Sequence, residues 1–213
     1  MHLLDLVFPP RCAGCGRGGH WFCSACVALI SPAPARQAPP EPLAALWAVG
    51  AYEDPLQAAI YAFKYEGKRR LAGPLGRLLL ATYRRQTRTS ARAGFDALVP
   101  VPLHPRRQAE RGYNQSALLA RVVGRGAGLP VVEDALRRTR DTPHQAWLNT
   151  AQRRANVVGA FTSEKGHPAL VDRKILLLDD VCSTGTTLSE SAKALLAAGA
   201  KEVWGLVLAR PAR

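Results

Sequence analysis

The most informative stretch of this chain is Lys174-Ile-Leu-Leu-Leu-Asp-Asp-Val-Cys-Ser-Thr-Gly-Thr-Thr187. Ile175 to Leu178 is a short, continuous apolar run, which is typical of a strand buried on both faces of a parallel sheet. Two carboxylates and a turn of small residues follow it. Leu188, Ala192 and Leu195 then recur at helical spacing. The segment therefore predicts a strand, a loop and a helix in succession.

The polar residues of this stretch indicate an anion site. Ligands of open α/β sheets bind beyond the carboxyl ends of the strands, where Asp179 and Asp180 would lie. The N–H groups of the loop and the start of the helix favour an anion, and Gly185 would allow it to approach closely. Further donors are the hydroxyls of Ser183, Thr184, Thr186 and Thr187. A simple helix cap is the alternative, but it explains neither the acidic pair nor the glycine.

An apolar strand, two acids and Thr-Gly-x-Thr closely resemble the phosphoribosyl pyrophosphate signature of the type I phosphoribosyltransferases. The resemblance implies that Asp179 and Asp180 hold the ribose hydroxyls, which makes them the catalytic candidates. It also implies that residues 183–187 hold the 5-phosphate. No nucleophile is required, because such a reaction proceeds by positioning and by stabilising the departing pyrophosphate.

Length and composition restrict the class of protein. The 213 residues suffice for one α/β domain with a small appendage, and 47% hydrophobic residues allow a sizeable core. No apolar run approaches the length of a membrane span, and no basic region precedes an apolar core at the N-terminus. These features predict a cytoplasmic protein.

Two C-x-x-C pairs, Cys12-Ala-Gly-Cys15 and Cys23-Ser-Ala-Cys26, stand close together near the N-terminus. Four thiolates complete a tetrahedral zinc shell, so we predict a structural zinc knuckle over residues 1–30. Disulfides suit a cytoplasmic chain poorly, and a redox dithiol needs only one pair. The proline-rich residues 31–42 predict a linker, which leaves residues 43–213 for the α/β domain.

The net charge of +13 is unevenly distributed. Residues 64–140 hold 17 basic and 5 acidic side chains, a pattern that points to a polyanionic partner. A solvated, arginine-rich surface is the alternative. A basic turn with two aromatic residues lies at 63–70, between two predicted helices. The nucleic-acid candidates are Lys64, Lys68, Arg69, Arg70 and Arg111.

A second predicted strand, residues 95–101, ends in the run Pro100-Val-Pro-Leu-His-Pro-Arg-Arg107. Pro102 marks the end of the strand, and a loop over residues 103–111 is expected at the ligand edge of the sheet. Together with Arg111-Gly-Tyr-Asn-Gln115 and the cysteine pairs, this run resembles the ComF family, which includes the relative called GntX. That family comprises phosphoribosyltransferase-like proteins associated with competence and DNA uptake.

The ComF resemblance covers nearly the whole chain and carries further expectations. It implies that Leu103, Arg106 and Arg107 bind pyrophosphate, and that magnesium accompanies this ligand. Paired guanidinium groups suit that role. The connection over residues 137–161 resembles the mobile hood that covers the substrate in type I phosphoribosyltransferases, the alternative being an ordinary long loop. Within it we expect a helix start over 150–157. Three side chains of this connection are candidates to face a base or a nucleic-acid strand: His144, Gln145 and Trp147.

Two functions follow from these expectations. The fold class is α/β, a mostly parallel sheet of about five strands flanked by helices. The first function is catalytic: transfer of a phosphoribosyl group, a glycosyltransferase-class reaction, between phosphoribosyl pyrophosphate or a related nucleotide and a nitrogenous acceptor that the sequence does not specify. The alternative is a non-catalytic accessory protein that binds single-stranded DNA or meets the DNA-uptake machinery and uses the fold as a scaffold.

Overall fold

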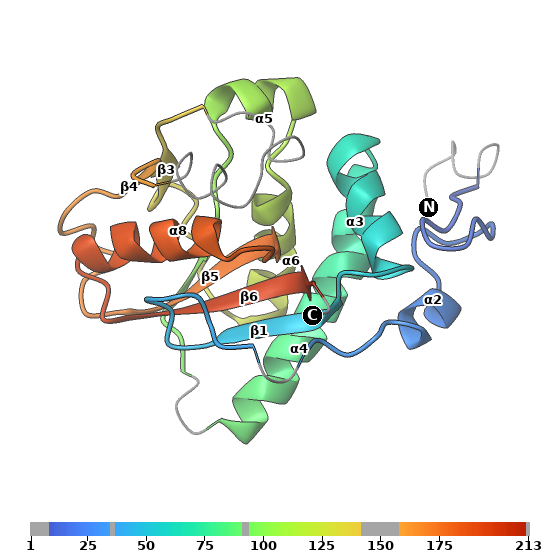
Figure 1. The fold of residues 1–213 in the computed structure, drawn as a ribbon, viewed down its shortest axis with the longest axis horizontal. Helices are drawn as coiled ribbons and strands as arrows, with labels where there is room; N and C mark the ends of the chain where they lie inside the picture. Colours follow the sequence, from blue (N-terminus) through green and yellow to red (C-terminus); the bar gives the residue numbers. More distant parts are fainter. Residues whose placement is uncertain (1–8, 35–36, 91–93, 142–157, 212–213) are drawn as a thin grey trace.

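The computed structural model describes residues 9–34, 37–90, 94–141 and 158–211. Its centre is a four-stranded, wholly parallel sheet (Figure 1). The strands lie in the order β1 (Leu46–Ala51), β6 (Glu202–Arg210), β5 (Lys174–Val181) and β2 (Ala97–Pro100). This arrangement confirms the predicted parallel α/β class and places β5 at the interior of the sheet.

The sheet has four strands among the described residues, where about five were expected, and beyond β2 it continues only as a single bridge. Val131 pairs in parallel with Leu98 at the free side of β2. Leu98 donates its N–H to Pro130, and Val132 donates to Leu98, both at 2.9 Å. A separate antiparallel pair is formed by β3 (Arg137–Arg138) and β4 (Phe161–Thr162), which flank the segment expected to be a hood.

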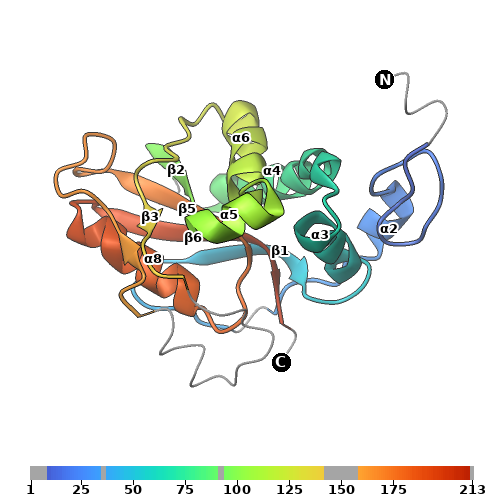
Figure 2. The same cartoon turned by 90° about the horizontal axis from the view of Figure 1, so that it is seen from above.

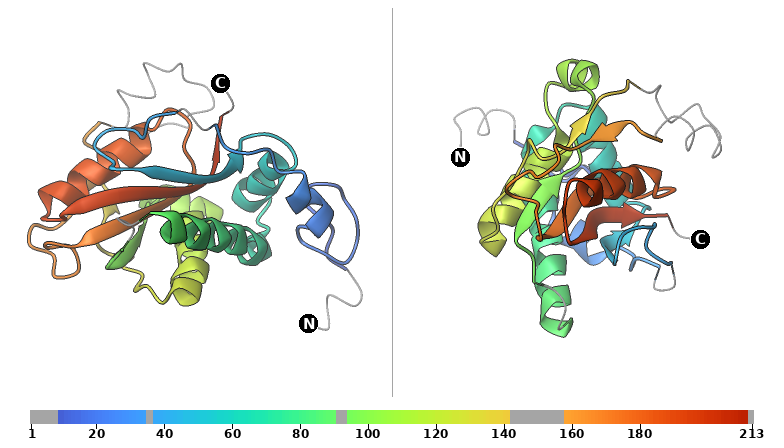
Figure 3. Two further views of the ribbon diagram at one scale, coloured as in Figure 1. Left: turned by 90° about the horizontal axis from the view of Figure 1, so that it is seen from below. Right: turned by 90° about the vertical axis from the view of Figure 1, so that its left-hand side faces the viewer.

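Both faces of the sheet are covered by helices (Figure 3). On one face lie α3 (Leu56–Tyr65), α4 (Ala72–Thr89) and α6 (Gln115–Ala127), and on the other lies α8 (Thr186–Ala197). Strand β5 feeds both cores, because Leu176 and Leu178 pack with the first group of helices while Ile175 and Leu177 pack with α8. Burial on both faces explains the uninterrupted apolar run of this strand.

The segment expected to be a loop over residues 103–111 is mostly helical, and that expectation was wrong. Helix α5 (Pro105–Arg111) begins with a proline in its first turn, a position where no N–H is needed. The Nδ1 atom of His104 accepts a hydrogen bond from the N–H of Arg106 at 3.4 Å, and Gly112 ends the helix in the left-handed conformation. A cap residue, a proline and a glycine were the missed local signals.

The N-terminal unit lies beside α3 at one end of the molecule (Figure 2). It contains the short helix α2 (Ser24–Ala28), and its Phe22 joins the same apolar core as Leu56 and Phe63 of α3. Described residues of the predicted linker are held against β6, since the guanidinium of Arg210 donates to the carbonyls of Gln37 and Ala38, both at 3.1 Å. A short 3-10 helix, η1 (Arg69–Leu71), precedes α4.

Some expectations fall outside the described residues. These are the helix start over 150–157 and the base-facing set of His144, Gln145 and Trp147. Within the described part of the chain, no helix combines the length and apolarity that crossing a membrane requires.

Candidate functional site

Asp179 and Asp180 lie near the carboxyl end of β5, and both are buried. The Oδ1 atom of Asp179 accepts a hydrogen bond from the hydroxyl of Ser116 at 2.9 Å and another from the N–H of Asp180 at 2.8 Å. Ser116 is in the first turn of α6, whose start is capped by the side chain of Asn114. The Arg111-Gly-Tyr-Asn-Gln115 segment therefore supplies the cap of α6, and Ser116, which directly follows it, is a hydrogen-bond partner of the acidic pair.

Lys64 is the direct partner of the acidic pair. Its Nζ lies 2.7 Å from Oδ1 of Asp180, and it reaches this position from the last turn of α3. Burial favours the neutral amine, but the charges of Asp180 and Asp179 outweigh that effect and raise the pKa of Lys64. The structure thus places this nucleic-acid candidate inside the acidic site rather than on a solvated turn.

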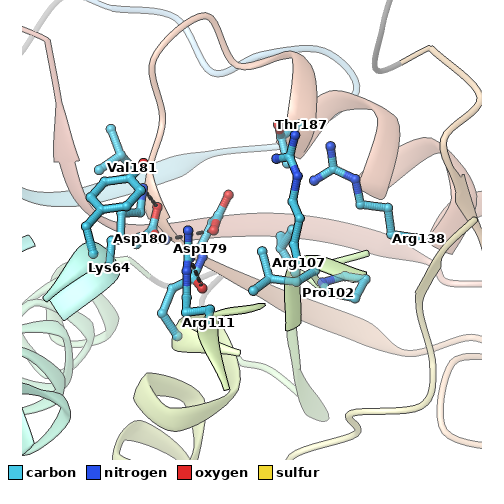
Figure 4. A pocket seen from close by; sticks show the side chains of 13 residues that line it. Lys64, Pro102, Arg107, Arg111, Arg138, Asp179, Asp180, Val181 and Thr187 are labelled. Carbon is cyan, nitrogen blue, oxygen red and sulfur yellow. Dashed lines mark hydrogen bonds and ion pairs between the residues drawn. The ribbon is translucent and has the colours of Figure 1, made fainter. Parts of the chain in front are cut away.

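A cavity of about 150 Å³, which we call the acidic cavity, opens over Asp179 and Asp180 (Figure 4). Side chains from α3, α5, α6, β3, β5 and α8 meet there. The charged and polar residues that line it are Lys64, Tyr65, Arg107, Arg111, Gln115, Arg138, Asp179, Asp180 and Thr187. Four cations thus face two carboxylates, and such a site favours an anionic ligand.

The two carboxyl groups differ in their surroundings. Burial and the neighbouring charge of Asp180 raise the pKa of Asp179 to about 7, although Lys64, the N–H of Asp180 and the hydroxyl of Ser116 act against this rise. The Oδ2 atom of Asp180 is buried and has no hydrogen-bond partner among the described residues. A buried carboxylate oxygen without a partner is costly, and a ligand hydroxyl or a cation would satisfy it.

The three pyrophosphate candidates are not equivalent in the structure. Leu103 and Arg107 line the cavity, whereas Arg106 is 79% exposed and does not. The carboxylate of Asp141 lies 3.7 Å from Nε of Arg107, 3.8 Å from Arg106 and 3.7 Å from Nδ1 of His104. An acidic side chain of the chain itself therefore sits against this basic cluster.

The five candidate phosphate-binding residues are also divided. Thr187 lines the acidic cavity, while Thr184, Gly185 and Thr186 line a neighbouring cavity of about 410 Å³. Ser183, with Thr184 and Gly185, lines another of about 260 Å³. The hydroxyls of Thr184 and Thr186 lie 3.0 Å apart.

Gly185 meets the proline-rich segment. Its φ of +81° is a conformation that suits glycine, and a Cβ at this position would lie 2.4 Å from the ring of Pro40. The sequence suggested that this glycine lets a phosphate approach, whereas the close approach in the structure is by Pro40. The adjacent Cys182 is buried, which raises the pKa of its thiol to about 11. Its thiol is therefore neutral, as befits a small filler rather than a nucleophile.

The remaining basic candidates make separate contacts. Lys68 pairs with Glu66 at 2.8 Å. Arg69 donates to the carbonyl of Gly112 at 2.9 Å, and Arg70 lies over the ring of Trp21, 5.8 Å from its centroid. Arg111 lies over Tyr65 and donates to Oε1 of Gln115 at 2.5 Å. Of these four arginines and lysines, Arg111 alone lines the acidic cavity.

Sequence patterns did not place three residues in this site, and Lys64 was expected to contact nucleic acid instead. Lys64 belongs to a run of basic residues, and Arg138 to the run Arg137-Arg-Thr-Arg140, so neither stood out from its neighbours. Ser116 lies near a helix start, where serine commonly has a capping role. The signal that could have found them is the apolar face of each element, which shows the side that packs inward. On α3, for example, the buried Phe63 is the direct neighbour of Lys64.

The candidate metal centre lies apart from the cavity. The Sγ atoms of Cys12, Cys15, Cys23 and Cys26 all lie within 4.8 Å of one another. Cys12 and Cys26 are 3.7 Å apart, as are Cys15 and Cys23. A tetrahedron with Zn–S bonds of about 2.3 Å has S–S edges of about 3.8 Å. The four thiols therefore fit a zinc ion, as the spacing predicted.

Comparison with known proteins agrees with this geometry. Residues 110–213 match the phosphoribosyl transferase domain family. The chain is 32% identical over 202 residues to competence protein F of Haemophilus influenzae, covering 94% of this chain and 85% of that protein. It is 33% identical over 204 residues to the DNA utilization protein YhgH of Escherichia coli K12, covering 95% and 84%.

Among solved structures, a glutamine phosphoribosylpyrophosphate amidotransferase from B. subtilis overlaps 63% of this chain and 25% of its own length, with 20% identity and a TM-score of 0.40. The sequence relatives are decisive, because each spans most of both chains. With its four-cysteine knuckle and its phosphoribosyl transferase domain, this chain belongs to the ComF family of competence and DNA utilization proteins.

Proposed function

We propose that this chain binds phosphoribosyl pyrophosphate, or a related nucleotide, in the cavity at the end of β5, and transfers its phosphoribosyl group to a nitrogenous acceptor. One observation carries the proposal: two buried acids and four cations converge in a single cavity at the carboxyl edge of a parallel sheet. Carboxylates accept hydrogen bonds from a ribose diol, and guanidinium groups bind phosphate oxygens.

Each group has a role in this proposal. Asp179 and Asp180 hold the ribose hydroxyls, and the ion pair with Lys64 keeps Asp180 in place. Residues 183–187, at the start of α8, hold the 5-phosphate, and Leu103 and Arg107 hold the pyrophosphate. Catalysis then consists of orienting the two reactants and stabilising the charge of the departing pyrophosphate.

Magnesium fits the donor set of this site. The partnerless Oδ2 of Asp180 is a hard oxygen ligand of the type that Mg²⁺ prefers, and the ion would offset the charge of the pyrophosphate. We further expect the protein to act in the cytoplasm, where thiols stay reduced and are available to a metal. The DNA-related names of the relatives support a role linked to competence, DNA uptake or DNA utilisation.

The test is calorimetric titration with phosphoribosyl pyrophosphate and with nucleotides, each with and without magnesium. We expect binding of phosphoribosyl pyrophosphate and at least a tenfold loss in a variant carrying Asp179→Asn and Asp180→Asn, because hydrogen bonds to charged groups contribute about 1.5–3 kcal/mol each. Adding Lys64→Met to this variant removes the buried cation that it leaves unpaired. Unchanged affinity in the folded triple variant would give the acids another role.

A second candidate function is single-stranded DNA binding without catalysis. Tyr61 and Tyr65 of α3 are both 53% exposed, and their ring centroids lie 5.0 Å apart. Lys68 and Arg70 follow within five residues of Tyr65. Exposed aromatic rings beside cations are the features with which proteins bind the bases and phosphates of single strands.

A further inference from the structure

Two guanidinium groups converge at one end of the acidic cavity. Arg107 reaches it from α5 and Arg138 from β3, and Thr187 of α8 lines the same cavity (Figure 4). Lys64 and Arg111 lie at the other end, beside the two acids. The cavity therefore has an acidic end that suits sugar hydroxyls and a basic end that suits an anion.

The basic end is costly for the protein by itself. The side chain of Arg107 is 16% exposed, and Arg138 as a residue is 8% exposed. Burial lowers the pKa of Arg138, the positive charge of Arg107 lowers it further, and the charges of Asp179 and Asp141 act in the opposite direction. Two like charges thus lie largely buried at one end of the cavity, and an incoming anion reduces the repulsion between them.

The position of Arg138 is fixed before any ligand arrives. Its backbone pairs with Phe161 in the β3–β4 ladder, and its guanidinium lies 5.4 Å from the centroid of the Phe161 ring. The next residue, Thr139, donates its N–H to Ala160 at 2.9 Å. A side chain held in this way binds a ligand without first losing much conformational freedom.

We propose that Arg107 and Arg138 together bind the pyrophosphate group of the ligand, and that Arg106 takes no part. This inference rests on the proposed function and names a residue of that site outside the α5 segment. Arg106 serves as an internal contrast, because it is the sequence neighbour of Arg107 yet is 79% exposed and outside the cavity. Two guanidinium planes facing one group from two elements can each form paired hydrogen bonds with it.

The experiment compares Arg107→Gln, Arg138→Gln and the matched control Arg106→Gln by calorimetry. Three probes are used with the full chain: phosphoribosyl pyrophosphate with magnesium, inorganic pyrophosphate, and ribose 5-phosphate. We expect the first two variants to lose at least tenfold in affinity for both pyrophosphate-bearing probes and to keep ribose 5-phosphate binding within about twofold. Arg106→Gln should bind all three probes within about twofold of the wild type.

A further variant should have the opposite effect. Asp141 lies 3.7 Å from Nε of Arg107 and its side chain is 38% exposed, so Asp141→Asn should leave the fold intact while removing a charge that competes with the ligand. Its affinity for inorganic pyrophosphate should rise by about threefold, the scale of an exposed ion pair. If Arg138→Gln does not fold, this variant still tests whether the basic end of the cavity binds pyrophosphate, and unchanged affinity would refute it.

The outcomes separate the two proposals. If the wild type binds phosphoribosyl pyrophosphate and Arg138→Gln binds it equally well, the arginine pair is refuted while the proposed function stands. Equal losses in Arg106→Gln and Arg138→Gln would also refute it, as would weaker or unchanged pyrophosphate binding in Asp141→Asn. If the wild type binds none of the three probes, both proposals fail.

Discussion

Asp179 is a buried carboxyl group whose pKa lies close to neutrality. Burial and the charge of Asp180 raise that pKa to about 7, against a value near 3.9 in an unfolded chain. The folded state therefore holds a proton that the unfolded state has released, and the stabilising contribution of this group falls as the pH rises from about 4 to about 7. A ribose diol, by contrast, hydrogen-bonds best to the ionised form.

Ligand affinity should therefore increase with pH through neutrality. We expect ribose 5-phosphate to bind more tightly at pH 8 than at pH 6, with a smaller change in Asp179→Asn, which cannot ionise at this position. The variant also serves as the control for the titration of the phosphate itself, whose second pKa is about 6. Calorimetry across this range provides the measurement, and identical pH profiles for the two proteins would contradict the role of Asp179.

The ion pair of Lys64 and Asp180 should contribute more to the free energy of unfolding than an exposed ion pair with a similar N–O distance. Asp180→Asn leaves a buried cation without its partner, which costs about 3–5 kcal/mol of unfolding free energy. Combining it with Lys64→Met should restore most of that loss, because both charges are then gone. Urea unfolding measures each free energy.

A matched control exists in the turn after α3. Lys68 and Glu66 lie 2.8 Å apart, and their side chains are 36% and 45% exposed. Lys68→Met should cost less than about 1 kcal/mol. If the two pairs prove equally weak, Lys64 is not held in the low-dielectric surroundings that the site requires.

At the scale of elements, the zinc knuckle and the α/β domain share one apolar core. Cys12, Phe22, Cys23 and Cys26 pack in the same cluster as Leu56 of α3. The knuckle is too small to have a core of its own, so a metal should support its structure and the packing against α3. Residues 1–30 as a separate unit remain a prediction.

Purified protein should carry about one zinc ion per chain, and Cys23→Ser should lose it and melt at a lower temperature. Elemental analysis and thermal melts measure these two effects. Cys182→Ala is the control, because this cysteine lies outside the cluster and should leave the zinc content unchanged. Freshly purified, reduced wild-type protein without zinc would rule out the metal centre.

The proline-rich segment and the phosphate loop form a second contact between elements. Gly185→Ala should be more destabilising than Gly128→Ala, since both glycines have positive φ but only Gly185 has Pro40 against it. The strain of the left-handed conformation costs about 1–2 kcal/mol in either variant, and the collision with Pro40 adds to it at Gly185.

Adding Pro40→Gly, which removes both the Cγ and the Cβ that the new methyl group would meet, should recover the extra loss in the Gly185→Ala protein and give no such gain in the Gly128→Ala protein. Urea unfolding of the four variants measures this difference. Equal free energies for the two glycine variants would mean that the segment does not press on the loop in solution.

For the molecule as a whole, the question is whether its excess of positive charge binds DNA. Replacing Lys68, Arg69 and Arg70 by alanine should flatten the logarithmic salt dependence of single-strand binding by about 0.7 for each phosphate group that these side chains neutralise. Fluorescence anisotropy with a labelled oligonucleotide at several salt concentrations measures the slope. Binding of phosphoribosyl pyrophosphate should change little, because none of the three lines the acidic cavity.

The control removes the same charge elsewhere. Arg77, Arg85 and Arg88 are exposed on α4, and Arg85 and Arg88 lie in its C-terminal part. Their replacement by alanine should leave the slope unaltered if the turn after α3 is the DNA contact. If the salt dependence has the same slope in both triple variants and in the wild type, the basic turn is a solvated surface and does not contact DNA. No binding by the wild type at low salt would exclude direct DNA binding.

The family, the parallel α/β class and the strand–loop–helix around Asp179 could all be predicted from the amino-acid sequence. These depend on local patterns: a continuous apolar run, helical spacing and the cysteine spacing of the knuckle. The same patterns predicted a loop over residues 103–111, which was wrong. This segment contains the short helix α5, which begins after the cap residue His104 and ends at Gly112. Among the described residues the sheet has four strands rather than about five, and only a single bridge at Val131 continues it beyond β2.

Which charges face the acids, by contrast, depends on the packing of distant segments. Lys64 and Asp180 are more than a hundred residues apart in the chain, and their contact requires α3 to pack beside β5. Arg138 enters the same cavity because β3 pairs with β4, and Pro40 meets Gly185 because Arg210 holds the preceding carbonyls. A run of basic residues carries no periodic signal of burial, so long-range packing alone separates the cations of the site from those of the surface.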